Sequence, residues 1–156
     1  MGSDSDLKVM EKCVDRLKSF DIPVEVRHLL GTPHPGCRRA ACEKCGGEGF
    51  GVIIAAAGKA AHLGGVLAAY TTLPVIGVPM ATSVMGGMDS LLSIVQMPKG
   101  IPVATVAIDG ADNAAILAAQ MIALSDEALA AKLAAFKADM AAEVTAKDEK
   151  VRAQFA

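Results

Sequence analysis

The chain is 156 residues long, and 53% of its residues are hydrophobic while only 3% are aromatic. This length supports one domain with its own core, which must be built from aliphatic and small side chains. A formal net charge of -2 argues against nucleic acid or an anionic membrane surface as the main partner. The longest apolar run is interrupted by Gly64, Gly65, Pro74 and Pro79, so it does not make a membrane span. The opening MGSDSD lacks the pattern of a secretory leader, so the cytoplasm is the expected compartment.

The chain opens with a turn rich in serine and aspartate, and an amphipathic helix is expected to follow it. The turn GSDSD at residues 2–6 supplies hydroxyl and carboxylate groups that can cap a helix. In residues 7–20 the apolar side chains share one face, which is typical of a helix that covers a sheet. Val24 to Val26 is predicted to be a short strand. Residues 27–49 show neither the hydrophobic period of a helix nor the alternation of a strand.

The stretch from Gly51 to Pro79 predicts a strand, a loop, a helix and a second strand. Val52 to Ala57 and Pro74 to Val78 are short continuous apolar runs, as expected for strands of a parallel sheet covered on both faces. Between them lie a loop of small residues and a helical segment, Gly58 to Gly65 and Val66 to Thr72. A Gly- and Ala-rich loop at the carboxyl end of a buried strand leaves backbone N–H groups free to bind a ligand.

The remaining predicted elements continue the alternation of helices and strands. They are a loop at 81–89, a short helix at Ser90 to Met97, a strand at Val103 to Ile108, an apolar helix at Ala111 to Leu124 and a long Ala-rich helix from Ser125 to about Lys147. The apolar helix is hydrophobic nearly all round, which favours burial between subunits. Ser125 is expected to be the N-cap of the last helix, with Asp126 and Glu127 in its first turn.

This order of elements predicts an α/β protein with a three-layer, flavodoxin-like parallel sheet. We expect one domain over residues 1–156, with a core at 1–124 and an oligomer-packing helix and tail at 125–156. A ligand-binding loop such as GSDSD normally follows a buried strand, and the first strand of this fold lies inside the sheet. The sheet is therefore expected to lack its first strand and to have a hole near its centre. Met1 is expected to be an internal methionine of a longer coding frame.

Several motifs together resemble one family closely. They are GSDSD before a helix, AAAGKAAHLGG, LPVIGVP and MDSLLSIVQMPKGIPVATVAI. The chain is similar in them to the N5-carboxyaminoimidazole ribonucleotide mutases of purine biosynthesis, of the bacterial type. The resemblance implies a homo-octamer with active sites at subunit junctions and a C-terminal helix that reaches a neighbour. It also implies an enzyme without cofactor or metal that converts N5-carboxyaminoimidazole ribonucleotide to 4-carboxy-5-aminoimidazole ribonucleotide.

The resemblance also implies which residues form the site. Ser3 would contact the region of the 5′-phosphate and Asp6 the ribose, with Ser5 beside them. Ala57, Gly58 and Leu63 would line the pocket for the base and the migrating carboxyl group. His62, on the same loop, would be the catalytic residue, because histidine can give and take a proton near neutral pH. Moving CO2 as a bound intermediate also needs a dry, closed pocket.

One segment departs from the family. The family signature SAHRTPD supplies a catalytic histidine and a phosphate-binding arginine, whereas this chain has RHLLGTPHPGC at residues 27–37. Aligning the two TP pairs puts Leu30 and Gly31 at the histidine and arginine positions. A frame shift is the better hypothesis: residues 28–37, back-translated and read one base later, permit Ser-Ser-Ala-His-Arg-Thr-Pro-Asp. Made as written, the chain lacks both groups, and little or no mutase activity is expected.

Alternative interpretations remain for the same residues. His34, Cys37, Cys42 and Cys45 have a spacing that suits a zinc site, although the shifted frame explains these cysteines as accidental codons. Cys13 is expected to be a small core residue. The Ser and Asp cluster and the loop histidine can also be simple helix caps. For the whole chain, the alternatives are a carboxylase that adds free CO2 to aminoimidazole ribonucleotide and an inactive or metal-binding paralogue.

Overall fold

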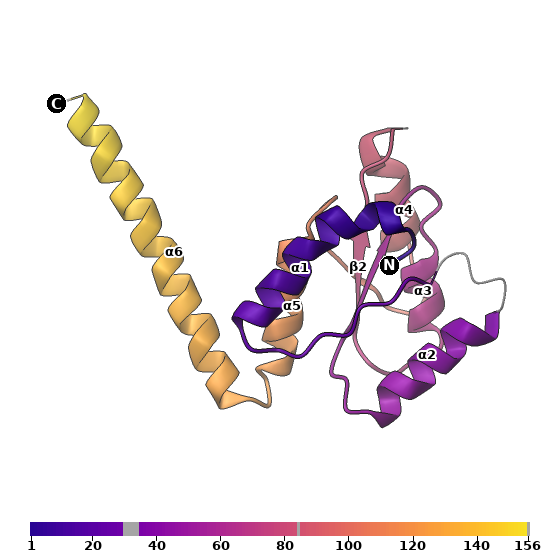
Figure 1. Cartoon of the computed structure of the whole chain (residues 1–156). Helices are drawn as coiled ribbons and strands as arrows, with labels where there is room; N and C mark the ends of the chain where they lie inside the picture. The colour runs from indigo at the N-terminus through magenta and orange to yellow at the C-terminus, as the bar shows by residue number, and fades with distance from the viewer. Residues whose placement is uncertain (30–34, 84, 156) are drawn as a thin grey trace.

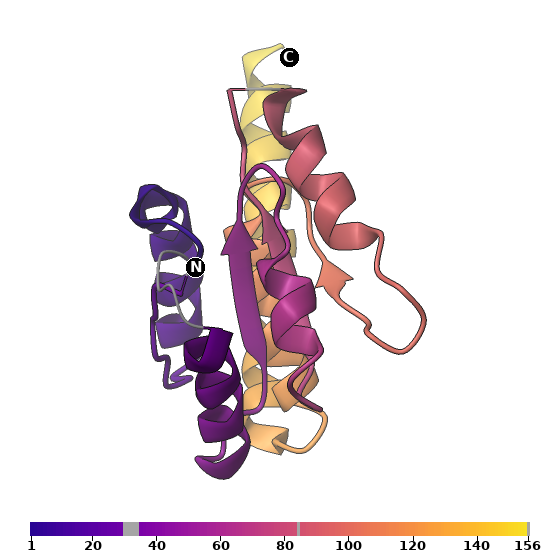
Figure 2. The ribbon, with the colours of Figure 1, turned by 90° about the vertical axis from the view of Figure 1, so that its right-hand side faces the viewer.

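The computed structural model describes residues 1–29, 35–83 and 85–155, and it shows helices on both faces of a small sheet (Figures 1 and 2). The sheet has three parallel strands in the order β1-β2-β3: Ile53–Ala57, Val75–Pro79 and Ala104–Thr105. Ile53 pairs with Val75 and Ala57 with Pro79, so β1 and β2 match over their full length. The predicted three-layer α/β class with a long C-terminal helix is confirmed.

The helices are, in chain order, η1 (Asp4–Asp6), α1 (Leu7–Ser19), α2 (Pro35–Gly47), α3 (Leu63–Ala68), η2 (Met85–Gly87), α4 (Met88–Val95), α5 (Ala111–Ile122) and α6 (Glu127–Gln154). The predicted helices are present with shifted bounds, and two further ones, α2 and η2, lie where no helix was expected. Helices α3 and α4 contact one face of the sheet, while α5 contacts the other face and packs against α1. None of the described helices is both long and apolar enough to cross a bilayer.

Small residues set the spacing between these layers. A Cβ atom placed on Gly77 of β2 would lie 2.4 Å from Cγ2 of Ile94, so glycine allows α4 to approach the strand. On the other face, Ala114, Ala115 and Ala118 of α5 are buried in the same core cluster as Ile76. Close packing of this kind explains how a core with so few aromatic side chains is filled.

Several predicted boundaries are wrong. Strand β3 covers only Ala104–Thr105 of the expected Val103 to Ile108, and α6 extends to Gln154 and not to about Lys147.

Three further differences bear on the cavity or the site. Residues 22–28 are not a strand, although Val24 to Val26 was expected to be one. A strand needs a hydrogen-bonded neighbour, and across from this segment lies a cavity. Helix α3 begins at Leu63 and not at Val66, because His62 already occupies the N-cap position. The N-cap of α6 is Asp126, whose carboxylate accepts a hydrogen bond from the Leu129 N–H at 3.0 Å, and not Ser125.

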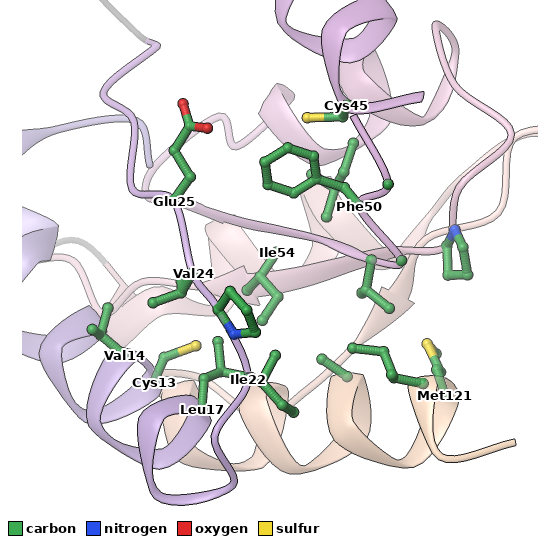
Figure 3. Close-up of a pocket in the computed structure, with 18 of the residues that line it drawn as sticks. Cys13, Val14, Leu17, Ile22, Val24, Glu25, Cys45, Phe50, Ile54 and Met121 are labelled. Atoms are coloured by element: carbon green, nitrogen blue, oxygen red, sulfur yellow. The ribbon is translucent and has the colours of Figure 1, made fainter. Parts of the chain in front are cut away.

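The expected hole in the sheet is present. A cavity of about 860 Å³ lies along the edge of β1 that faces away from β2, and residues 22–27 line its opposite side (Figure 3). Cys13 lies on its wall and is 3% exposed, so its predicted place in the core is confirmed. Residues 22–27 thus face this cavity in place of a neighbouring strand, which explains why they form no strand themselves.

Candidate active site

Three segments meet where the strands end. The Gly2 N–H donates to the Ala56 carbonyl at 2.8 Å, which fixes the Ser3–Asp6 turn at the carboxyl end of β1. A Cβ atom on Gly58 would lie 3.4 Å from Cγ2 of Thr82, so the loop after β1 contacts the loop after β2. Parallel strands place their carboxyl ends at one edge of the sheet, and ligands of open α/β sheets bind outside that edge. The GSDSD turn and the histidine loop are therefore neighbours, as the resemblance requires.

The Ser3–Asp6 turn is held by hydrogen bonds within itself. The Ser3 N–H donates to Oδ2 of Asp6 at 3.1 Å, and the Ser5 N–H donates to Oγ of Ser3 at 3.2 Å. Asp6 is only 7% exposed, whereas Ser5 is exposed and Ser3 is partly buried. These bonds form a capping box at η1, so Ser3 and Asp6 do cap this short helix. The Ser5 hydroxyl donates to Oγ of Ser3 at 2.8 Å, and because Ser5 is exposed a ligand can still reach its oxygen.

His62 extends from the loop that precedes α3. Its Nδ1 lies 2.8 Å from the carbonyl oxygen of Ala60, which favours the tautomer in which Nδ1–H donates and Nε2 carries the lone pair. The imidazole is exposed, and it makes no capping hydrogen bond to the described part of α3. His62 therefore occupies the N-cap position of α3, but its side chain makes no capping hydrogen bond there. An oriented histidine with a free Nε2 has the geometry of a proton donor or acceptor.

The other three predicted site residues differ in what they can offer a ligand. Ala57 is 1% exposed and Leu63 is 2% exposed, and both side chains belong to a core cluster under α3. Their side chains position the loop, and the Ala57 carbonyl already accepts a hydrogen bond from the Met80 N–H at 3.0 Å. Gly58 is partly buried and has no side chain, so its backbone is the part that can contact a ligand.

The loop after β2 contributes polar groups that the sequence analysis did not assign. The Ala81 N–H donates to Oδ1 of Asp109 at 2.9 Å, and Thr82 Oγ1 donates to Oδ1 of Asp89 at 3.1 Å. Asp109 has a φ of 56°, a conformation that aspartate adopts more readily than most residues. The Gly, Ser and Met content of residues 81–89 indicated a loop here, but it gave no way to select the side chains that hold it.

The cysteines of residues 37–45 behave as packing residues where they are described. Cys42 is 2% exposed, and its thiol donates to the Leu67 carbonyl at 3.8 Å. Burial, followed by Cys45 and Glu43, raises the pKa of this thiol and so disfavours the thiolate that a metal requires. No cluster of three or more metal-ligating side chains occurs among the described residues. His34 and the Cys37 side chain lie outside them.

The fold and the site together define an α/β protein of the class that binds ligands at the carboxyl edge of a parallel sheet. A family model described as AIR carboxylase matches residues 1–143. The chain belongs to this family.

Named relatives agree with this assignment. An N5-carboxyaminoimidazole ribonucleotide mutase of Mycobacterium tuberculosis is 48% identical over 152 residues, which cover 97% of this chain and 87% of that protein. The mutase of Methanocaldococcus jannaschii is 48% identical over 155 residues, covering 99% of this chain and 96% of that protein. The crystal structure of Treponema denticola PurE superposes with a TM-score of 0.85 at 26% identity, covering 96% of this chain and 94% of that one.

Proposed function

We propose that the chain is an N5-carboxyaminoimidazole ribonucleotide mutase that acts in the cytoplasm. The supporting observation is that the GSDSD turn and the AAAGKAAHLGG loop, which carry the resemblance, meet at one edge of the sheet. The substrate is a small ribonucleotide. Ser3, Ser5 and Asp6 bind its phosphate and ribose, while Gly58 and the loop up to Leu63 bind the base.

The reaction requires one proton to leave and one to arrive. The C–N bond to the carboxyl group breaks, and the released CO2 forms a C–C bond at the ring carbon. The ring carbon then loses its proton, and the exocyclic nitrogen gains one. His62 performs this exchange through Nε2, because Nδ1 is occupied by the Ala60 carbonyl. The surrounding loops retain the CO2 until it reacts.

The role of His62 is tested by His62→Asn, which removes the proton donor and acceptor. Loss of general acid–base catalysis lowers kcat by about 10²-fold or more. The matched control is Gln120→Ala, an exposed position on α5. Turnover is followed separately with N5-carboxyaminoimidazole ribonucleotide and with aminoimidazole ribonucleotide plus CO2. Preference for the second substrate pair identifies the carboxylase alternative, and unchanged kcat in His62→Asn removes His62 from the mechanism.

Residues 27–49 set the level of activity that we expect. Because the chain lacks the histidine and arginine of SAHRTPD, we expect low turnover from it as written. A variant in which SAHRTPD replaces residues 30–36 restores both groups, and its kcat/KM rises by at least about 10²-fold. The His62 variants are compared in both backgrounds. If neither chain turns over either substrate, the inactive-paralogue alternative is favoured.

We also propose that the protein is a homo-oligomer, with an octamer as the expected form. Helix α6 projects away from the remainder of the chain (Figure 1). Apolar side chains remain exposed along it. They are Met140, Val144, Val151 and Phe155. Light scattering coupled to size exclusion measures the mass directly. Removal of residues 140–156 lowers the number of subunits in the assembly if these side chains pack on other copies, and it leaves that number unchanged if they do not.

A further inference from the structure

The loop between β1 and α3 is anchored by buried residues and presents two polar side chains to solvent. Ala57, Ala61 and Leu63 are buried, and they hold both ends and the middle of the loop in one core cluster. Lys59 and His62 lie between these anchors and are exposed. A short, anchored loop therefore carries an ammonium group and an imidazole on its solvent side.

Lys59 adopts a backbone conformation that favours glycine. Its φ is 57°, in the left-handed region, where a residue with a Cβ atom is strained. This conformation leads the chain into a tight turn, in which the Ala60 carbonyl accepts a hydrogen bond from the His62 N–H at 2.9 Å. Glycine would form the same turn with less strain, so the geometry of the turn does not account for a lysine. A side chain kept at such a position suggests a use for that side chain.

The charges at this edge of the sheet are unbalanced. The described segments that meet there are residues 2–6, 58–62, 80–83, 85–89 and 106–110. Their carboxylates are those of Asp4, Asp6, Asp89 and Asp109, and Lys59 is the one lysine or arginine among them. The substrate proposed above carries two anionic groups, a phosphate and a carboxylate. Binding it at an edge rich in carboxylates requires a cation, and in these segments Lys59 supplies it.

The Lys59 ammonium is available to a ligand. It takes part in none of the ion pairs that the described residues form. The four aspartates of the edge instead accept hydrogen bonds from residues of the same loops. A lysine ammonium is a compact charge with three donors on a flexible stem, so it can follow a small anionic group.

We propose that Lys59 binds the carboxylate of the substrate and thereby selects carboxylated ribonucleotides over aminoimidazole ribonucleotide. This inference rests on the function proposed above, in which the loop up to Leu63 binds the base and the Ser3–Asp6 turn binds the phosphate. The anionic group on the base is then the one that this loop meets. His62 exchanges the protons, and Lys59 holds the carboxylate by a charge-assisted hydrogen bond.

The charge of the carboxyl group changes during the reaction, and this predicts a kinetic signature. Substrate and product both carry the group as an anion, whereas the intermediate CO2 is neutral. A lone ammonium group therefore stabilises the bound substrate and product more than the intermediate. Loss of the Lys59 charge raises KM and leaves kcat unchanged or higher, because the interaction that is lost belongs to the ground state.

The test measures the binding of two ribonucleotides that differ in the carboxylate. The ligand 4-carboxy-5-aminoimidazole ribonucleotide carries it and aminoimidazole ribonucleotide lacks it, and calorimetry gives both Kd values. In Lys59→Met the Kd of the carboxylated ligand rises about tenfold, while that of the other changes by less than about twofold. Lys59→Arg keeps the charge and retains most of the affinity. The matched control is Lys99→Met, in the exposed turn before β3, which leaves both Kd values unchanged.

Lys59→Gly separates the charge from the backbone conformation. Glycine adopts a φ of 57° without a Cβ penalty, so Tm stays the same or rises. The affinity for the carboxylated ligand nevertheless falls, as in Lys59→Met. A residue with only a structural role would change Tm and leave the Kd values as they are.

Three outcomes overturn the proposal. Unchanged Kd values in Lys59→Met and Lys59→Gly show that the lysine is only a solvated loop residue. Equal weakening of both ligands assigns the ammonium group to the phosphate and not to the carboxylate. In these two cases the proposed function stands without this role for Lys59. If the unaltered chain binds neither ribonucleotide, the proposed function fails and this inference fails with it.

Discussion

The two edges of β1 show what one strand gains from a neighbour. Toward β2, five residue pairs form the ladder, and Ile76 and Val78 on the facing strand are 0% exposed. Toward residues 22–27, β1 receives one backbone hydrogen bond, from Gly2, and Ile54 beside the cavity is only half-buried. One edge of β1 therefore lies in a closely packed core, and its other edge borders a cavity. The difference arises from the presence of a partner strand and not from the residues of β1.

The largest expected effect on stability comes from truncating one side chain in each of the two strands β1 and β2. Ile76→Ala removes a fully buried side chain from β2, and we expect a loss of about 2–5 kcal/mol in the free energy of unfolding. Ile54→Ala removes a side chain that already borders a cavity, so its loss is expected to be below about 1.5 kcal/mol. Urea unfolding measures both. Equal losses would show that the two edges are packed equally well.

The close approach of α4 to β2 can be disrupted by adding a methyl group at Gly77. Gly77→Ala brings Cβ to 2.4 Å from Ile94 and 3.0 Å from Val103, and we expect a loss of about 1–3 kcal/mol. Gly64→Ala is the matched control, because its nearest neighbours are at ordinary contact distance, 3.6 Å or more. Chemical denaturation of the two variants measures the difference. A control as unstable as Gly77→Ala would contradict the steric explanation.

The start of α6, at the rim of the cavity, supplies a smaller effect. Asp126→Ala removes the N-cap acceptor of the Leu129 N–H and is expected to cost about 1 kcal/mol. Ser125→Ala, one residue earlier, serves as the control and is expected to change stability by less than about 0.5 kcal/mol. Thermal unfolding compares them. A larger loss for Ser125→Ala would restore Ser125 as the cap.

The last expected effect is a pH dependence of the stability, which arises from Cys13 in the wall of the cavity. Burial, with a further contribution from Asp112, raises the pKa of the Cys13 thiol from 9.0 to about 11. The unfolded chain therefore releases this proton first, and stability falls as pH rises from 9 toward 11, by on the order of 1 kcal/mol at pH 10. Comparing unfolding at pH 8 and pH 10 in wild type and Cys13→Ala isolates the effect. An identical pH dependence in the variant would assign it to other groups.

Much of the fold could be predicted because the relevant signals are local. The apolar runs around Ile54 and Ile76 indicated parallel strands, and the structure has β1 and β2 there. The segment at Val24 was predicted to be a strand from its residue types. This prediction failed because strand formation also depends on a hydrogen-bonded neighbour, and among the described residues a cavity lies beside this segment.

The candidate site was predicted less completely, for a related reason. The AAH context of His62 marked it as a site residue, but its hydrogen bond to Ala60 depends on loop geometry. Asp109 was not predicted, because its role arises from a left-handed backbone and a contact with Ala81 far away in sequence. Contacts of this kind have no periodic or motif signal.

Helix α6 has a consequence for how the chain moves in solution. Its 28 residues span about 42 Å, and its last buried side chain within the described chain is Leu129, in the first turn. A single subunit with this arm tumbles anisotropically and diffuses more slowly than a sphere of equal mass. Ion pairs between residues four apart, such as Glu143 with Lys147 and Asp148 with Arg152, support the distal turns only weakly. Amide exchange should therefore quicken steadily toward residue 154, in a gradient that disappears once the arm lies against another subunit.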